Sequence, residues 1–173
     1  MITRNTLHNF FLVQQSLIQT ILILSFCFVQ VSLNFLSFLF ISQPYLMVIF
    51  LFLLITRSDN PPSSALLIFA GMFYDLITGT HLGIHSLFFI LIKILIFFYE
   101  ERYKLSKFYG EWILFSIVYS LTLIITKITF IIVNFTLPDL NAISFNLGLT
   151  LLIFPIISFL IDLPKYFLSF VLR

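Results

Sequence analysis

The residues of this chain best placed to do chemistry lie around Asp75, an acidic residue inside a long apolar run. Gly71 stands four residues before it and Gly79 four residues after it, so all three share one face of a helix. Because two of these positions have no side chain, a second backbone can approach closely beside the carboxylate. An ionisable side chain in an apolar segment is costly, and it therefore indicates a specific role.

Two kinds of role are open for Asp75. As an aspartate beside a glycine-rich turn, it could cap the following helix or accept hydrogen bonds from the amides of its own turn. It could instead contact a ligand or a partner protein, or pair with Lys93 or Lys127, the two cations inside apolar segments. The two lysines could equally form structural pairs that only fix packing.

His81 and His85 have the i, i+4 spacing of helical metal ligands. A metal site would need at least a third ligand, and Asp75 is the one acid nearby. The H-E-x-x-H motif is absent from the sequence. We therefore expect no metal site here.

The tandem acids Glu100 and Glu101 resemble the beginning of an intramembrane-protease motif. Leu105 stands where that motif requires an arginine, and paired charges at a helix end are typical of a solvated rim. The sequence contains no glycine-rich phosphate loop, nucleophile elbow or cysteine pair. We therefore expect no catalytic residues, no cofactor and no enzymatic activity.

The composition is typical of an integral membrane protein. Hydrophobic residues make up 61% of the 173 residues and charged residues 9%, whereas soluble domains contain about 25% charged residues. The formal net charge of +2 is too small to indicate a nucleic-acid partner. Cys27 is the single cysteine, which excludes an internal disulfide and a cysteine metal cluster.

Charges and helix-breaking turns divide this single membrane domain, residues 1–173, into six apolar segments. Two of these segments lie before Arg57, and Pro44 can open the helix of the second one. The most charged loop, Glu100–Glu111, precedes the fifth segment, and Pro155 is expected to bend the sixth. We expect transmembrane helices at residues 14–38, 43–56, 64–78, 82–99, 112–135 and 143–163, and an interfacial tail at 165–173.

The distribution of cations predicts the orientation of these spans. With six spans and a cytoplasmic N-terminus, the outer turns contain no lysine or arginine and only Asp139 as a charge. The inner segments contain Arg4, Arg57, Arg102, Lys104, Lys107, Lys165 and Arg173. We therefore expect both termini in the cytoplasm.

Polar residues inside three of the expected spans recur at helical spacing. Such stripes are typical of helix–helix contacts or of a polar cavity, because lipid-facing positions would not retain them. The stripes are Gln15, Gln19, Gln30 and Asn34 in the first span, Ser86, Lys93 and Glu100 in the fourth, and Ser120, Lys127 and Asn134 in the fifth.

Around the third-span turn the sequence resembles the MreD family of rod shape-determining proteins of the bacterial inner membrane. The hallmark of that family is a glycine, then Asp-Leu, a further glycine, and Leu-Gly. The corresponding residues here are Gly71, Asp75, Leu76, Gly79, Leu82 and Gly83. His81 departs from the pattern, since a proline is common at that position. The chain length, the short second span and the six-span outline are also similar.

This resemblance implies a non-enzymatic scaffold subunit of the machinery that synthesises the lateral cell wall and maintains rod shape. The implied partners are the bitopic protein MreC, the actin-like MreB filament, and the RodA glycosyltransferase with its transpeptidase. The motif residues would then be structural or partner-docking elements, and the charged loop a cytoplasmic contact surface. The implied all-α fold is similar to that of the substrate-binding subunits of energy-coupling-factor vitamin transporters.

That similarity supplies the alternative function, a substrate-binding subunit of a vitamin-type transporter. Its ligand pocket would lie at the outer ends of the third and fourth spans, with Asp75, His81 and His85 as polar contacts. Such subunits usually carry an alanine-rich first helix, and the first two spans here contain no alanine. An unrelated small channel or transporter is a third alternative, and it would need a continuous polar pathway.

Overall fold

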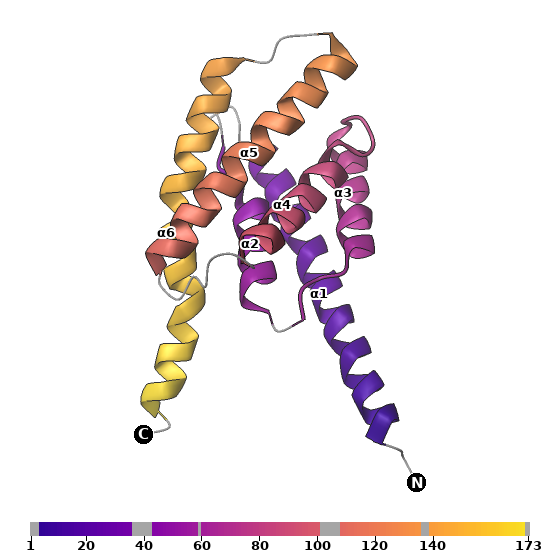
Figure 1. Ribbon diagram of the computed structural model, residues 1–173, viewed down its shortest axis with the longest axis vertical. Coiled ribbons are helices and arrows are strands. Elements are labelled where there is room, and N and C mark those ends of the chain that lie inside the picture. The colour runs from indigo at the N-terminus through magenta and orange to yellow at the C-terminus, as the bar shows by residue number, and fades with distance from the viewer. Residues whose placement is uncertain (1–3, 36–42, 59, 101–107, 136–138, 172–173) are drawn as a thin grey trace.

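The computed structural model describes residues 4–35, 43–58, 60–100, 108–135 and 139–171, and this part of the chain holds six α-helices and no strand. The helices are α1 (Arg4–Phe35), α2 (Leu46–Arg57), α3 (Ser64–Thr78), α4 (Ile84–Glu100), α5 (Phe108–Asn134) and α6 (Leu140–Val171). The long helices α1 and α6 diverge toward one end of the molecule, where α1 begins and α6 ends (Figure 1). The expected all-α class is confirmed.

Three of these helices have the length and composition needed to cross a membrane. The apolar stretches are Ser16–Leu33 in α1, Tyr109–Val133 in α5 and Leu140–Asp162 in α6. The other three are apolar but have only 12, 15 and 17 residues. At about 1.5 Å per residue they rise roughly 18–26 Å, less than the ~30 Å hydrocarbon core of a bilayer.

Helix boundaries differ from the expected spans chiefly in α1, α5 and α6. α1 begins at Arg4, α5 begins at Phe108, and α6 continues beyond residue 163 as far as Val171. The tail expected from residue 165 is therefore part of α6 over its described length. Residues 36–38, most of the charged loop at 101–107, and the side chains of Gln15, Asn34, Glu100 and Asn134 lie outside what the structure describes.

α6 passes through Pro155 without a break. Proline has no N–H, so the carbonyl of Leu151, four residues earlier, loses its usual helical donor. Trp112 of α5 takes the place of that donor, with its indole Nε1 donating to Leu151 O at 3.1 Å. This bond satisfies the carbonyl where the helix cannot, and it ties α5 to α6.

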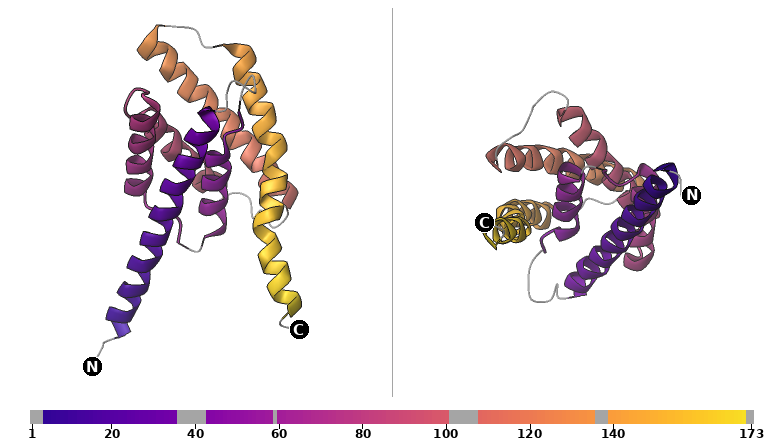
Figure 2. Two further views of the ribbon diagram at one scale, coloured as in Figure 1. Left: turned by 180° about the vertical axis from the view of Figure 1, so that it is seen from behind. Right: turned by 90° about the horizontal axis from the view of Figure 1, so that it is seen from below.

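α2 lies at the centre of the packing, in contact with α1, α4, α5 and α6 (Figure 2). Seven of its twelve residues are buried. Phe52 meets the rings of Phe115 and Phe154 edge-on, and those two rings stack with centroids 4.2 Å apart. An apolar aromatic core thus joins α2, α5 and α6.

Two glutamines of the α1 polar stripe contact the segments that flank α2. Gln30, only 1% exposed, donates to Pro44 O and accepts from Met47 N, both at 3.2 Å. Gln19 donates to Asn60 O at 2.6 Å. These side chains satisfy backbone groups where α2 begins and where the chain turns after it. Gln30 thus makes a helix contact of the kind that the stripe predicts, whereas Gln19 contacts the segment after α2.

The far end of α2 is held by an ion-pair cluster. Arg57 donates to Glu111 of α5 at 2.6 Å and to Asp162 of α6 at 2.8 Å. It also donates to Ser158 at 2.7 Å. The fork of donors on one guanidinium therefore binds three helices together. Glu111, expected in a charged loop, lies in the first turn of α5 and is used inside the protein.

Candidate functional site

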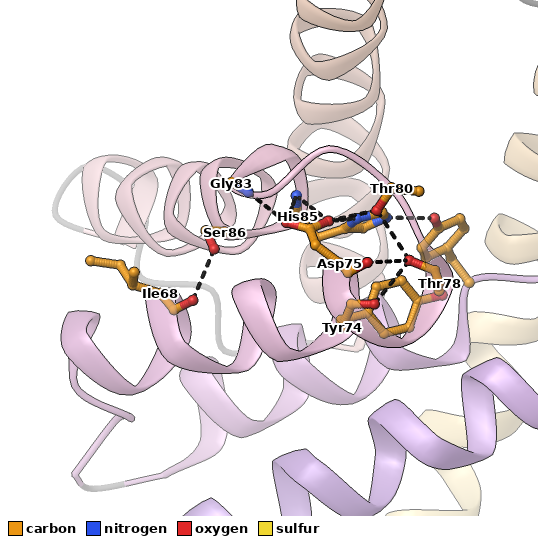
Figure 3. A network of polar contacts seen from close by, with 9 residues as sticks. Ile68, Tyr74, Asp75, Thr78, Thr80, Gly83, His85 and Ser86 are labelled. Carbon is orange, nitrogen blue, oxygen red and sulfur yellow. Dashed lines mark hydrogen bonds and ion pairs between the residues drawn. The ribbon is translucent and has the colours of Figure 1, made fainter.

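The motif around Asp75 folds as a hairpin of α3 and α4, whose backbones approach each other very closely. A Cβ atom built on Gly71 would lie 2.3 Å from both Cα and N of Ser86. Ser86, on α4, donates its hydroxyl to Ile68 O of α3 at 2.8 Å (Figure 3). The close backbone approach predicted beside Asp75 is confirmed, and only glycine fits at position 71.

Two further glycines shape the turn between the helices. Gly79 ends α3 in the left-handed conformation, with φ 68°, and its N–H donates to Asp75 O. Gly83 has φ 101°, which L side chains rarely adopt. The glycine at each position is therefore explained by backbone conformation.

The carboxylate of Asp75 is fully buried and accepts hydrogen bonds from the turn that follows it (Figure 3). Thr80 Oγ1 donates to Oδ1 at 2.9 Å, and Gly83 N donates to Oδ2 at 2.7 Å. The backbone N–H of His85 lies 3.3 and 3.4 Å from the two carboxylate oxygens. Because these amides begin α4, the negative charge sits at a helix N-terminus, where the helix dipole favours it. Of the roles left open, these contacts correspond to ordering the turn and capping α4.

The imidazole of His85 completes the set of donors. Its Nδ1 lies 2.5 Å from Asp75 Oδ1, and its Nε2 lies 3.1 Å from the hydroxyl of Tyr45. Since an ionised carboxylate can only accept, Nδ1 carries the proton, and in the neutral ring Nε2 accepts from Tyr45. This chain of three side chains links α3, α4 and the residue before α2. These contacts hold His85 in one tautomer and orient the Tyr45 hydroxyl.

Sequence reasoning did not find this pairing. It treated His85 as a possible metal ligand or pocket residue and sought the partner of Asp75 among the lysines. The available signal was the position of His85 in the first turn of the helix that Asp75 caps, where a ring nitrogen can reach the capping carboxylate. No pattern pointed to Tyr45, which lies 40 residues away from His85 in the sequence.

Neither of the two lysines considered as partners of Asp75 contacts it. Lys93 donates to Pro62 O at 2.7 Å and to Ser64 Oγ at 3.3 Å, at the beginning of α3. Lys127 lies over the ring of Phe130, 5.8 Å from its centroid. The ion pairs among the described residues use other partners, and the lysine pairing considered for Asp75 is wrong.

The remaining motif positions face outward. Leu82 is 60% exposed and His81 is exposed, whereas His85 is turned toward Asp75. Within the described ranges no three histidine, cysteine or acidic side chains gather as metal ligands would. The motif is thus an internally bonded hairpin with an apolar residue at its tip.

A cavity of about 380 Å³ lies beside this hairpin. Its walls come from α4, α5 and α6, together with Tyr45 and Thr80. His85 and Lys127 line it, but Asp75 and His81 do not. Of the three residues expected as polar contacts of a ligand pocket, only His85 therefore lines this cavity.

Comparison of the chain with protein-family models, with curated proteins and with solved structures finds no match.

Proposed function

We propose that this chain is a six-span protein of the bacterial cytoplasmic membrane, with both termini in the cytoplasm. It would be a scaffold subunit of the cell-wall elongation machinery, resembling the MreD family, and would not be an enzyme. It would bind an MreC-like bitopic protein and the wall synthases, and it would act together with an MreB-like filament. Its fold would be similar to that of energy-coupling-factor substrate-binding subunits.

The arrangement of helices supports the membrane topology. α1 begins and α6 ends at the same end of the molecule, as an even number of crossings requires (Figure 1). The helices α2, α3 and α4 are shorter than the hydrocarbon core, so the segments that flank them would lie at membrane depth. Crossing is still possible because neighbouring helices can shield the irregular backbone of these segments from lipid. The one-sided distribution of lysine and arginine then favours cytoplasmic termini.

The observation that carries the scaffold proposal is the internal bonding of Asp75. All the donors that the structure gives its carboxylate come from the turn and from the first residues of α4. A buried acid bonded in this way is a poor ligand contact or proton carrier, but it makes the hairpin rigid. A rigid hairpin with exposed Leu76 and Leu82 is suited to contact another membrane protein.

Complementation in a rod-shaped bacterium that lacks its own MreD-family protein tests this proposal. We expect Asp75→Ala and Gly71→Ala to give rounded cells and to lose co-purification of the MreC-like partner. Gly148→Ala is the matched control, since a Cβ atom there meets nothing within 4 Å. Membrane levels of each variant are measured in parallel, so that a loss of protein is not taken for a loss of function.

A second measurement does not depend on altering the hairpin. A photo-crosslinking residue placed at Leu76 or Leu82, both exposed, should capture the MreC-like partner in native membranes. Rod shape and normal co-purification in the Asp75→Ala strain, together with no captured partner at either position, would overturn the scaffold proposal.

The cavity beside the hairpin favours the second candidate, a substrate-binding subunit of a vitamin-type transporter. Its volume of about 380 Å³ lies within the range of small-molecule sites. In that case the purified protein alone should bind a water-soluble vitamin tightly. A panel of radiolabelled vitamins, tested by equilibrium dialysis, separates this candidate from the scaffold.

A further inference from the structure

The cavity beside the hairpin has walls that are mostly apolar and aromatic. Ile84 and Phe88 of α4, Leu123 and Phe130 of α5, and Ile143 of α6 supply much of the lining. We call it the α4–α6 cavity. A space of this kind accommodates the body of an apolar molecule, and its few polar groups would decide which molecule binds.

Most of those polar groups already donate to the protein itself. Tyr119 donates to Asn146 Oδ1 at 2.6 Å, and the Asn146 amide donates in turn to the backbone of Gln43. Thr126 donates to the carbonyl of Thr122 at 2.9 Å. The N–H and O–H groups in these bonds are not available to a ligand unless an existing bond is broken, and the Asn146 amide has one further N–H, which is uncharged.

Tyr45 and Thr80 are used in the same way. Tyr45 bonds with His85, and Thr80 donates to Asp75. The hairpin network therefore forms one polar wall of the α4–α6 cavity and leaves it no spare donor. This leaves one group with a full charge and unused donors.

That group is the ammonium of Lys127. Its contact in the structure is the face of Phe130, at 5.8 Å, and none of the ion pairs among the described residues includes it. The ammonium carries three donors, and in an apolar setting an uncompensated cation is costly. An anion in the cavity would remove that cost and would use donors that the protein leaves open.

We infer that the α4–α6 cavity binds an amphipathic anion, with its carboxylate or phosphate at Lys127 and its apolar body against the aromatic walls. Asp139 also lines the cavity, and its carboxylate accepts from Asn141 N at 2.9 Å. This acid is exposed and disfavours multiply charged anions, so a single negative charge fits best. The inference does not rest on the scaffold role.

Such an anion could be a lipid with a phosphate headgroup or a smaller carboxylate. Native mass spectrometry of the full chain in detergent, with dioleoylphosphatidylglycerol against dioleoylphosphatidylcholine, tests the lipid source. Scintillation proximity binding of tritiated decanoate against tritiated decanol tests the carboxylate source. In at least one arm, the anionic probe should bind about tenfold more tightly than its neutral counterpart.

Three variants connect this binding to the cavity. Lys127→Met removes the charge and should abolish the preference for the anion, whereas Lys127→Arg should retain it. Ala142→Phe, which fills space in the cavity lining, should abolish binding although Lys127 is kept. Lys93→Met is the control for general attraction of anions, because Lys93 lies outside the lining.

Circular dichroism and gel filtration establish that each variant is folded. If the unaltered chain prefers the anionic probe in the lipid experiment alone, and Lys127→Met abolishes that preference, the ligand is a phospholipid. If the same result is found in the decanoate experiment alone, the ligand is a small carboxylate. The inference is overturned if both arms show equal binding of charged and neutral probes. It is also overturned if Lys127→Met or Ala142→Phe binds the anionic probe as the unaltered chain does.

Discussion

His85 Nδ1 lies 2.5 Å from Asp75 Oδ1, and this contact joins the first turn of α4 to the last turn of α3. A ring N–H here donates to a carboxylate that is fully buried and already oriented by backbone amides. The pair fixes the tautomer of His85 and thereby directs Nε2 toward Tyr45. One acidic residue thus determines the geometry of the turn and of the cavity wall beside it.

Replacing Asp75 by Asn should destabilise the protein, although the two side chains have nearly the same shape. The amide NH₂ of Asn would face either Gly83 N–H, which is a clash of donors, or the His85 ring, which would have to give up the tautomer that accepts from Tyr45. We expect the free energy of unfolding to fall by about 1–3 kcal/mol. Thermal unfolding in detergent, followed by circular dichroism, measures this loss. Asp139→Asn, at an exposed carboxylate, should have little effect, and equal melting of both variants would contradict the prediction.

Gly71→Ala should destabilise the protein by a steric clash, although alanine has the higher helix propensity. The new methyl group would lie 2.3 Å from backbone atoms of Ser86, so α3 and α4 must move apart. We expect a loss of about 1–3 kcal/mol, as for other overpacked sites. Gly148→Ala in α6 introduces the same methyl group into open space and should be neutral or stabilising by about 0.5 kcal/mol. A stabilised Gly71→Ala variant would show that the helices are not in contact there.

The two turn glycines should respond differently to asparagine. At Gly79, φ 68° is a left-handed conformation that asparagine adopts readily, so Gly79→Asn should cost at most about 1 kcal/mol. At Gly83, φ 101° lies outside that region, and Gly83→Asn should cost more, about 1–3 kcal/mol. The melting temperatures of the two variants provide the comparison. If Gly79→Asn proves the less stable of the two, the turn has another conformation.

Arg57→Lys should weaken the packing of α2 against α5 and α6. A single ammonium cannot reproduce the fork that reaches Glu111, Asp162 and Ser158. The Arg57 side chain is 16% exposed, so solvent screens these bonds only in part, and we expect a loss of about 1–3 kcal/mol. Arg57→Met should be worse, because two carboxylates then remain without a cation. Denaturation midpoints rank the variants, and a Met variant as stable as the unaltered chain would show that the cluster contributes nothing.

The number and class of helices could be predicted because helix breakers and charges interrupt a uniformly apolar sequence. Pro44 and the polar residues after Arg57 separate apolar runs that would otherwise merge. Hydropathy alone could not decide whether α2, α3 and α4 cross a bilayer, since a short apolar helix can be a core element as well as a span. The close approach at Gly71 was predictable because a missing side chain permits it.

Contacts between distant residues could not be predicted in this way. Arg57 meets Glu111 and Asp162 across separations of 54 and 105 residues, and no local pattern specifies such pairs. The partner of Asp75 depends on the path of the turn, which brings His85 Nδ1 within hydrogen-bond distance of the carboxylate. Periodicity identified Lys127 as a residue of interest, but only the packing of α4, α5 and α6 shows that it lines a cavity.

The bond from Trp112 to the carbonyl freed by Pro155 has a spectroscopic consequence. Trp112 is the single tryptophan of the chain, so all indole fluorescence comes from the junction of α5 and α6. Separation of these helices would expose the indole N–H to water and shift the emission to longer wavelength. The protein therefore contains its own optical reporter of α5–α6 docking, which can be read in vesicles and without a label.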